Sequence, residues 1–364
     1  MKLLFAADLV PTSSTEKYFV DGDTDKLFGK INNLVKGMDR FIVNLECALT
    51  DHDGAIRKFG PNLKASPKCV NAIKKLGVTD VMLSNNHTLD FGVQGLRDTA
   101  AVLDEAGIPY AGIGENDTDS RKPHVIECEG KKIGIINVCE HEYTYALPNR
   151  MGANPFDPFL TMQDIREAKK NCDFVIVVYH GGKEYCRYPS PRLYNLAHEM
   201  VLCGADTVLM QHSHCVGSYE YYEGGHILYG QGNFNFVYPE YVEKTTGWYT
   251  ALLVELDIDK KVDVIFHPIV ATTTGCDLAE GEAAKEIMTE FAKRNEEMKN
   301  GKWRDGWHAF CMAPEREVYY RALRDYVDED EDGKNRQLFA HYLDCEAHTD
   351  VWREIFKTWN HTNK

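Results

Sequence analysis

The stretch Phe174–Gly182, FVIVVYHGG, is the segment from which the fold can be inferred. Its first six residues are apolar and rich in β-branched side chains, which is typical of a buried strand. The run ends in His180, whose imidazole can hold a metal ion, and the two glycines after it let the backbone approach a ligand closely. The stretch predicts a parallel strand with a ligand-binding group at its carboxyl end. The alternative is a core histidine satisfied by hydrogen bonds.

The same pattern recurs elsewhere in the chain, where short apolar runs end in polar groups. Helical stretches separate these runs, so the pattern favours an α/β sheet with parallel strands. Because such sheets bind ligands at the carboxyl ends of their strands, we expect the polar groups to meet at one edge. The other runs are Lys2–Ala7 before Asp8, Phe41–Leu45 before Glu46, Asp80–Ser84 before Asn85-Asn86-His87, and Thr207–Met210 before Gln211-His212-Ser213-His214.

The chain changes character after the last of these motifs. Residues 216–222, 226–229, 249–257 and 262–269 look like antiparallel strands, and the sequence becomes polar and helical from about 277. We therefore expect an α/β sandwich in residues 1–276 and a helical appendage in 277–364. Gly77 and Gly107 are expected to end helices. The main predicted helices are 25–36, 67–76, 93–106, 159–171, 191–203, 280–299, 313–328, 334–345 and 348–360.

Composition narrows the class of protein. The chain has 364 residues, 43% of them hydrophobic, which is enough for a folded core. Its net charge of −15 argues against nucleic-acid or anionic-membrane binding. No apolar stretch approaches the ~18 residues of a membrane span, and the N-terminal run is too short for a signal peptide, so a cytoplasmic protein is expected. The eleven cysteines lack C-x-x-C spacing and are expected to be reduced and mostly buried.

The polar groups at the strand ends form a plausible metal-binding set. His212 and His214 are one residue apart, so both rings can face one side of an extended segment. Mixed nitrogen and oxygen donors suit manganese, iron or zinc better than calcium or magnesium, and one or two divalent ions are expected. The alternatives are polar loop histidines and a helix-capping asparagine. The candidate metal ligands are Asp8, Glu46, Asn86, His180, His212 and His214.

Other side chains near these ligands are candidates for acting on a substrate. His87 is a candidate for proton transfer, and Asp90, three residues later, could orient its ring through the other nitrogen. Basic residues in the loop 51–66 could meet an anionic substrate, although a solvated loop is the alternative. A glycine-rich turn at 230–234 is expected close to the site. The candidate substrate-binding residues are Arg57, Lys58, Lys64, Glu184 and Asn233.

Five motifs together resemble a known family. They are FIVNLECAL at 41–49, SNNHTLDFG at 84–92, HGGKEY at 180–185, QHSHCVGSYEY at 211–221 and GQGNFNF at 230–236. In order and spacing they resemble the bacterial CapA, or poly-gamma-glutamate capsule-synthesis (PGA_cap), family of the calcineurin-like metallophosphoesterase superfamily. The resemblance covers roughly residues 1–270. It implies a four-layer α/β/β/α sandwich, to which the C-terminal helices would be an extension.

The resemblance also implies roles for individual residues. Glu46 stands where the superfamily has a bridging aspartate, and His87 matches the histidine thought to protonate the leaving group. The chain departs from the superfamily at the first motif, Asp-x-His, which here is Asp8-Leu9-Val10, so one ligand is missing. Occupancy of a second ion site therefore stays open. One site would use Asn86, His180 and His212 with Glu46, and the other Asp8 and His214.

These observations predict a metal-dependent hydrolase, most simply a phosphoesterase, that acts on an anionic small molecule or polymer. Two alternatives remain open. The family name suggests a gamma-glutamyl amide hydrolase in capsule biosynthesis. The missing first-motif ligand favours a non-catalytic component of a polymer-synthesis assembly, in which the C-terminal helices could mediate docking or homo-oligomer formation.

Overall fold

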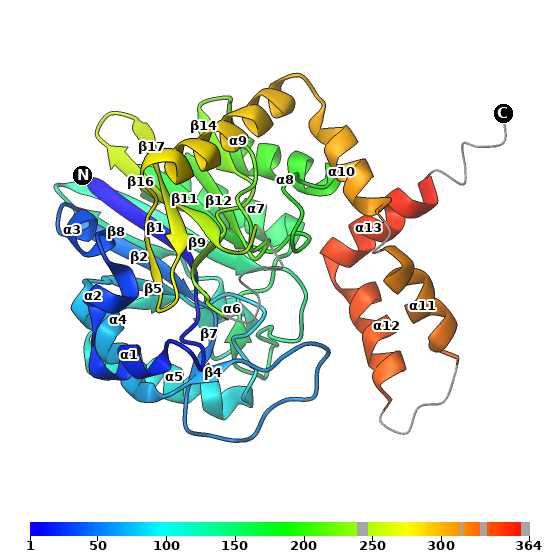
Figure 1. Ribbon diagram of the computed structural model, residues 1–364, viewed down its shortest axis with the longest axis horizontal. Helices are drawn as coiled ribbons and strands as arrows, with labels where there is room; N and C mark the ends of the chain where they lie inside the picture. The colour runs from blue at the N-terminus through cyan, green and yellow to red at the C-terminus, as the bar shows by residue number, and fades with distance from the viewer. Residues whose placement is uncertain (239–246, 314–315, 328–332, 358–364) are drawn as a thin grey trace.

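The computed structural model describes residues 1–238, 247–313, 316–327 and 333–357, and in it two β-sheets pack face to face (Figure 1). Phe5 and Ile42 of one sheet share a buried core with Ile135 and Val178 of the other. Further apolar clusters lie between the outer face of each sheet and its helices. The four-layer α/β/β/α sandwich is therefore confirmed.

The first sheet combines a parallel half with an antiparallel half. Its parallel strands are neighbours of the N-terminal strand β1, and its antiparallel strands follow later in the chain. The order is β18 (Cys276–Leu278), β17 (Val262–Ala271), β16 (Thr250–Ile258), β1 (Lys2–Leu9), β2 (Arg40–Leu45), β5 (Asp80–Met82) and β6 (Tyr110–Ala111), with β15 (Asn233–Asn235) also paired to β1.

The second sheet is parallel at its centre and antiparallel at both margins. Its order is β13 (Tyr219–Tyr222), β14 (Gly225–Leu228), β12 (Thr207–Gln211), β11 (Phe174–His180), β9 (Lys131–Cys139) and β8 (His124–Cys128). Two short ladders join β3 (Ala48–Leu49) to β4 (Lys64–Ala65) and β7 (Ile113–Gly114) to β10 (Gly152–Ala153).

The helices of the sandwich cover both outer faces. The first sheet is covered by α1 (Glu16–Asp21), α2 (Thr24–Phe28), α3 (Ile31–Val35), α4 (Val70–Leu76), which follows a 3₁₀ turn (Pro67–Cys69), and α5 (Gly92–Ala106). The second sheet is covered by α7 (Pro158–Asn171) and α8 (Pro191–Leu202), and α6 (Asp117–Ser120) lies beside β7.

The predicted helix over residues 25–36 is wrong as a single element. The chain turns at Gly29, where φ is +43°, and α2 and α3 are separate helices. The Asp277 carboxylate accepts a hydrogen bond from the Lys30 backbone N–H, and it lies where a Cβ on residue 29 would be. Gly77 and Gly107 do end helices in the left-handed conformation, as predicted.

The chain after β18 is helical throughout its described part. α9 (Gly281–Lys299) packs on β13 and β17, and α10 (Trp303–Cys311), which was not predicted, follows it. α11 (Glu317–Asp325), α12 (Lys334–Asp344) and α13 (Glu346–Lys357) lie beside the sandwich (Figure 1). The acidic run 328–332 and the end of the last predicted helix fall outside the described residues. The division at residue 277 stays a prediction.

Two expectations from composition can be compared with the structure. All eleven cysteines are free thiols, and nine of them are buried. Within the described ranges, no helix combines the length and the apolar character that crossing a membrane requires.

Candidate metal centre

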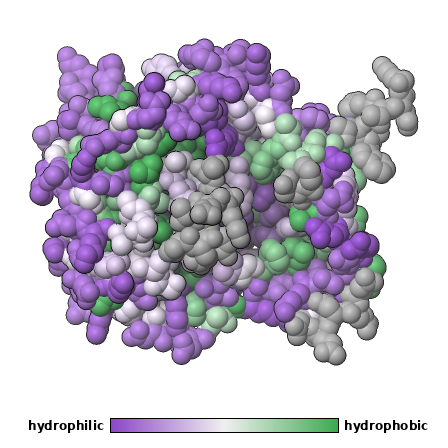
Figure 2. All heavy atoms as spheres, viewed as in Figure 1, coloured by the Kyte–Doolittle hydropathy of each residue, from purple (hydrophilic) through white to green (hydrophobic). Residues whose placement is uncertain are grey.

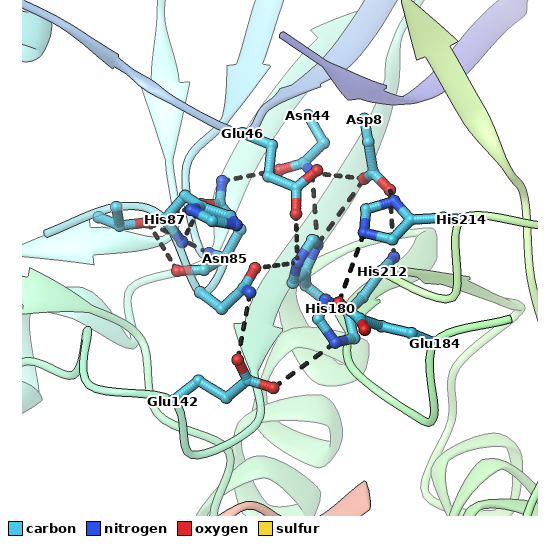
Figure 3. A network of polar contacts seen from close by, with 12 residues as sticks. Asp8, Asn44, Glu46, Asn85, His87, Glu142, His180, Glu184, His212 and His214 are labelled. Carbon is cyan, nitrogen blue, oxygen red and sulfur yellow. Dashed lines mark hydrogen bonds and ion pairs between the residues drawn. The ribbon is translucent and has the colours of Figure 1, made fainter. Parts of the chain in front are cut away.

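Strand ends from both sheets meet at one edge of the sandwich (Figure 3). Asp8 is near the end of β1, and Glu46 follows β2 directly. From the second sheet, His180 ends β11, and the segment after β12 carries His212 and His214. The parallel strands of the two sheets thus bring together side chains that are far apart in the sequence.

The six candidate ligands form one cluster of donors. Ligand atoms of Glu46, His180 and His212 all lie within 4.8 Å of one another, and so do those of Asp8, Glu46 and His214. Glu46 belongs to both groups. The Asn86 amide oxygen lies 2.9 Å from His180 Nε2, which places it beside the first group. All these side chains are buried.

The chemistry of this cluster fits a divalent cation. Neither carboxylate oxygen of Glu46 has a hydrogen-bond partner among the described residues, and His212 Nδ1 has none either. Burial and the nearby charge of Asp8 raise the pKa of Glu46 well above its usual value. A buried polar atom without a partner costs about 1–3 kcal/mol, and more when it carries charge. A cation between these donors would satisfy them.

The protonation states of the histidines also suit metal binding. Burial lowers the pKa of His180 to about 4 and that of His212 to about 3, so both rings are neutral at neutral pH. Neutral imidazole is the form that ligates metals. At His214, burial alone would lower the pKa, but the hydrogen bond to Asp8 and the charge of Glu46 outweigh it and raise the pKa. Without a cation, His214 therefore pairs with the acids.

The segment after β12 holds its histidines in an unfavourable backbone conformation. His212 has φ +87° and His214 has φ +53°, in the left-handed region that side-chain-bearing residues rarely adopt. Such conformations cost about 1–3 kcal/mol and cluster at functional sites. Asn233 Oδ1 lies 2.8 Å from His214 Nδ1 and orients this ring. Asn233 therefore contacts a candidate ligand, and it is not among the cavity-lining residues, contrary to the substrate-binding role expected for it.

His87 lies beside the donor cluster in a fixed orientation. Its Nδ1–H donates to Asp90 Oδ2 at 2.6 Å, which is the arrangement expected from the three-residue spacing. The Lys58 ammonium forms a buried ion pair with Asp90 and lies 3.2 Å from His87 Nδ1. Burial and the charge of Lys58 lower the pKa of His87 to about 4, against the opposing effect of Asp90.

A cavity of about 560 Å³ opens over this cluster. Of the expected substrate-binding residues, Lys58 and Glu184 line it. Arg57 and Lys64 do not. Lys64 Nζ lies 2.6 Å from Asp53 Oδ1, and Arg57 lines a separate hollow, because the loop 51–66 directs only one of its three basic side chains inward.

Several cavity residues were missed by the sequence analysis. Glu142 Oε2 accepts a hydrogen bond from Asn86 Nδ2 at 3.2 Å, and its Oε1 lies 3.5 Å from His212 Nε2. The signal was present, because β9 is a parallel strand and its carboxyl end runs into Glu140-His141-Glu142. His341, Tyr342 and His348 also line the cavity, and no local pattern marks them.

Comparison with known proteins decides the family. Residues 2–238 match the model described as bacterial capsule synthesis protein PGA_cap. The chain belongs to this family. The PGA_cap match ends before β16, so α12 and α13 lie outside it.

Two curated relatives have related names. The capsule biosynthesis protein CapA of Bacillus anthracis is 32% identical over 222 residues, covering 58% of this chain and 54% of that protein. The PGA biosynthesis protein CapA of Bacillus subtilis is 28% identical over 242 residues, covering 64% of this chain and 62% of that protein. The chain thus spans between half and two thirds of the length of these relatives.

Solved structures resemble the chain more distantly. A novel phosphatase from Mycoplasma pneumoniae has a TM-score of 0.45 at 18% identity, covering 80% of this chain and 98% of that one. A 5'-nucleotidase from Staphylococcus aureus, titled as such on putative grounds, has a TM-score of 0.44 at 16% identity, covering 80% and 58%. At these scores the likeness carries no argument about function.

Proposed function

We propose that this PGA_cap protein is a metal-dependent hydrolase that cleaves phosphoesters at the cavity over Glu46. The observation that carries the proposal is the shared position of Glu46. Its two buried oxygens belong to both donor groups and lack any hydrogen-bond partner in the described chain. A carboxylate placed in this way is explained by a cation and by little else.

The donors divide the work between holding cations and holding substrate. Manganese, iron or zinc would be held by the six buried ligands of the cluster. When bound, such an ion lowers the pKa of a water molecule and neutralises negative charge on the substrate. Lys58 and Lys183 line the same cavity and favour an anionic substrate. The absence of a histidine at Val10 leaves the number of ions to be measured.

His87 is placed to move a proton at the leaving oxygen. Its Nδ1 is committed to Asp90, so Nε2 is the atom available for exchange. Burial and Lys58 keep this ring neutral at neutral pH in the free protein. An anionic phosphoryl group beside the ring favours the protonated form and so prepares it to act as an acid.

The test uses the purified chain loaded with manganese, iron or zinc. We expect metal-dependent hydrolysis of p-nitrophenyl phosphate or of bis-p-nitrophenyl phosphate. His87→Asn should lower kcat about 100-fold or more, because proton transfer by a positioned side chain contributes that much. The matched control is His198→Asn, which removes a histidine that pairs with Glu220 on the second sheet, outside the cavity.

A gamma-glutamyl amide is the second candidate substrate, because one relative is named a PGA biosynthesis protein. Gamma-glutamyl-p-nitroanilide in the same assay separates the two activities. Turnover of neither substrate class with any of the metals would rule out the catalytic proposal and favour a non-catalytic part of an assembly.

A further inference from the structure

The cavity wall is completed by a part of the chain that the family match does not reach. His341 and Tyr342 on α12 line it, together with Ala347 and His348 at the start of α13. These residues lie about a hundred positions beyond the matched region 2–238. The space-filling view shows a hollow between the sandwich and the C-terminal helices (Figure 2). The C-terminal helices are therefore placed to contact whatever binds over the donor cluster.

His341 is held there by ring stacking. Its imidazole stacks on Phe59, with centroids 5.5 Å apart and planes at 27°, and on Tyr143, at 5.7 Å and 15°. These contacts fix the plane of the ring and leave its nitrogen-bearing edge for polar contacts. Within the described part of the chain, the ring nitrogens of His341 have no hydrogen-bond partner, although the residue is only 8% exposed.

The backbone that supports this stack is strained. Tyr143 has φ +72°, which a bulky aromatic residue adopts only when its surroundings enforce it. Its hydroxyl accepts a hydrogen bond from the Phe59 backbone N–H at 3.3 Å. The loop 51–66, the segment 140–157 and α12 thus meet at one imidazole. Strain of this kind is typical of ligand-binding positions.

The rest of the cavity is rich in aromatic side chains. Rings of this kind bury flat organic groups well, and a volume of about 560 Å³ suits a small molecule. The polar part of the cavity, by contrast, is concentrated around the donor cluster and Lys58. The aromatic lining residues are Phe59, Tyr185, Phe236, Tyr238, Trp248 and Tyr342.

We propose that His341 is a substrate-binding residue supplied by the C-terminal helices, and that the substrate is a small phosphoester whose alcohol part carries a planar ring with polar atoms. The inference rests on the proposed function, which places the phosphoryl group beside Glu46 and His87. The planar ring then lies among the aromatic side chains, and the edge of His341 hydrogen-bonds to its polar atoms. His341 determines which leaving group fits and takes no part in bond cleavage.

The test compares an aromatic with an aliphatic substrate. His341→Phe keeps the stacking on Phe59 and Tyr143 and removes the hydrogen bond. We expect the KM for p-nitrophenyl phosphate to rise about tenfold with kcat nearly unchanged, because one hydrogen bond in a buried site contributes on that order. The KM for glycerol 2-phosphate should change less than twofold. His308→Phe is the matched control, since this histidine of α10 pairs with Glu354 and does not line the cavity.

Direct binding separates this inference from the proposed function. Calorimetry with p-nitrophenyl phosphonate, which is not hydrolysed, should give a Kd about tenfold weaker for His341→Phe. His341→Gln, which keeps a hydrogen-bonding group, should stay within about threefold of the natural chain. Binding without any turnover would refute the hydrolase proposal and leave the role of His341 standing. Equal Kd values for the natural chain and His341→Phe, equal losses in both variants, or no binding at all would overturn it.

Discussion

Glu46 shows at the scale of one residue why this site needs a cation. Its carboxylate is fully buried close to the carboxylate of Asp8, and neither of its oxygens has a hydrogen bond within the described residues. Burial of a charge costs several kcal/mol unless an opposite charge compensates it. In the free protein the raised pKa of Glu46 relieves part of this cost by protonation. A bound cation would restore the ionised form.

Glu46→Gln tests this directly. The amide has nearly the same size as a protonated carboxyl group, so we expect the metal-free variant to be about as stable as the natural chain. The natural chain should gain about 2–3 kcal/mol when a metal is present at about a hundred times its Kd, and the variant should gain almost nothing. Elemental analysis and thermal unfolding with and without a chelator would measure both effects.

Glu127→Gln is the matched control for that experiment, because Glu127 is an exposed acid that pairs with Lys132 on the surface. It should bind metal like the natural chain. Unchanged metal content in Glu46→Gln would contradict the central role of Glu46 in the donor cluster.

At the scale of the elements, the ends of parallel strands were predictable from the sequence. Each predicted ligand follows or ends a short apolar run, and the topology of the two sheets brings these ends to one edge. The same rule applied to β9 would have found Glu142. It was missed because that strand was treated only as half of the β8–β9 hairpin, and its second neighbour, β11, cannot be inferred from local sequence.

The break in the predicted helix 25–36 has a similar origin. The pattern of apolar residues continues through Gly29, but a side chain from position 277 sets the turn there. Contacts across such a distance in the chain leave no local signal, so only the presence of a glycine hinted at the break.

Asp80 provides a prediction about how the two sheets are held together. It begins β5 in the first sheet, forms an ion pair with Arg40 of β2 and contacts His124 of β8 in the second sheet at 2.7 Å. Burial alone would raise the pKa of Asp80, but His124, Thr79 and Arg40 together lower it. A carboxyl group with a lowered pKa in the folded state stabilises the protein above its unfolded pKa of about 4.

Asp80→Asn should therefore destabilise the protein by about 2 kcal/mol at pH 7, since a buried charge pair is broken. The difference from the natural chain should shrink as the pH falls from about 4 through the lowered pKa of Asp80, where the natural carboxylate also becomes neutral. Urea unfolding between pH 3 and pH 7 would measure it. A difference that stays constant over this range would show that the charge of Asp80 is not the cause.

At the scale of the whole molecule, the cavity depends on how the C-terminal helices attach to the sandwich. Buried polar contacts make this attachment, beside a small apolar cluster around Trp307 and Tyr319. Asp350 of α13 accepts hydrogen bonds from Ser190 at 2.6 Å and from Arg192 at 2.8 Å. Sequence could predict the helices themselves from their composition. It could not predict which surface they cover, because an amphipathic pattern identifies a buried face and not its partner.

Asp350→Asn should loosen this attachment while leaving the metal centre intact. The variant keeps the shape of the side chain but removes the charge that pairs with Arg192, whose guanidinium then retains only Glu140 as an acidic partner. We expect backbone amides in α12 and α13 to exchange hydrogen about ten to thirty times faster, which corresponds to about 1.4–2 kcal/mol of local stability. Amides in β1 and β11 should be unaffected, and so should the metal content. Because His341 moves with these helices, the KM for p-nitrophenyl phosphate should rise.

Asp325→Asn is the matched control, since Asp325 lies in the same helical region but pairs with Arg324 at its surface. It should change neither exchange nor KM. Faster exchange spread evenly over both sheets and the helices would mean that Asp350 supports the entire fold rather than one attachment. Faster exchange confined to α12 and α13 with an unchanged KM would separate the helices from substrate binding. The cavity would then have to be regarded as a property of the sandwich alone.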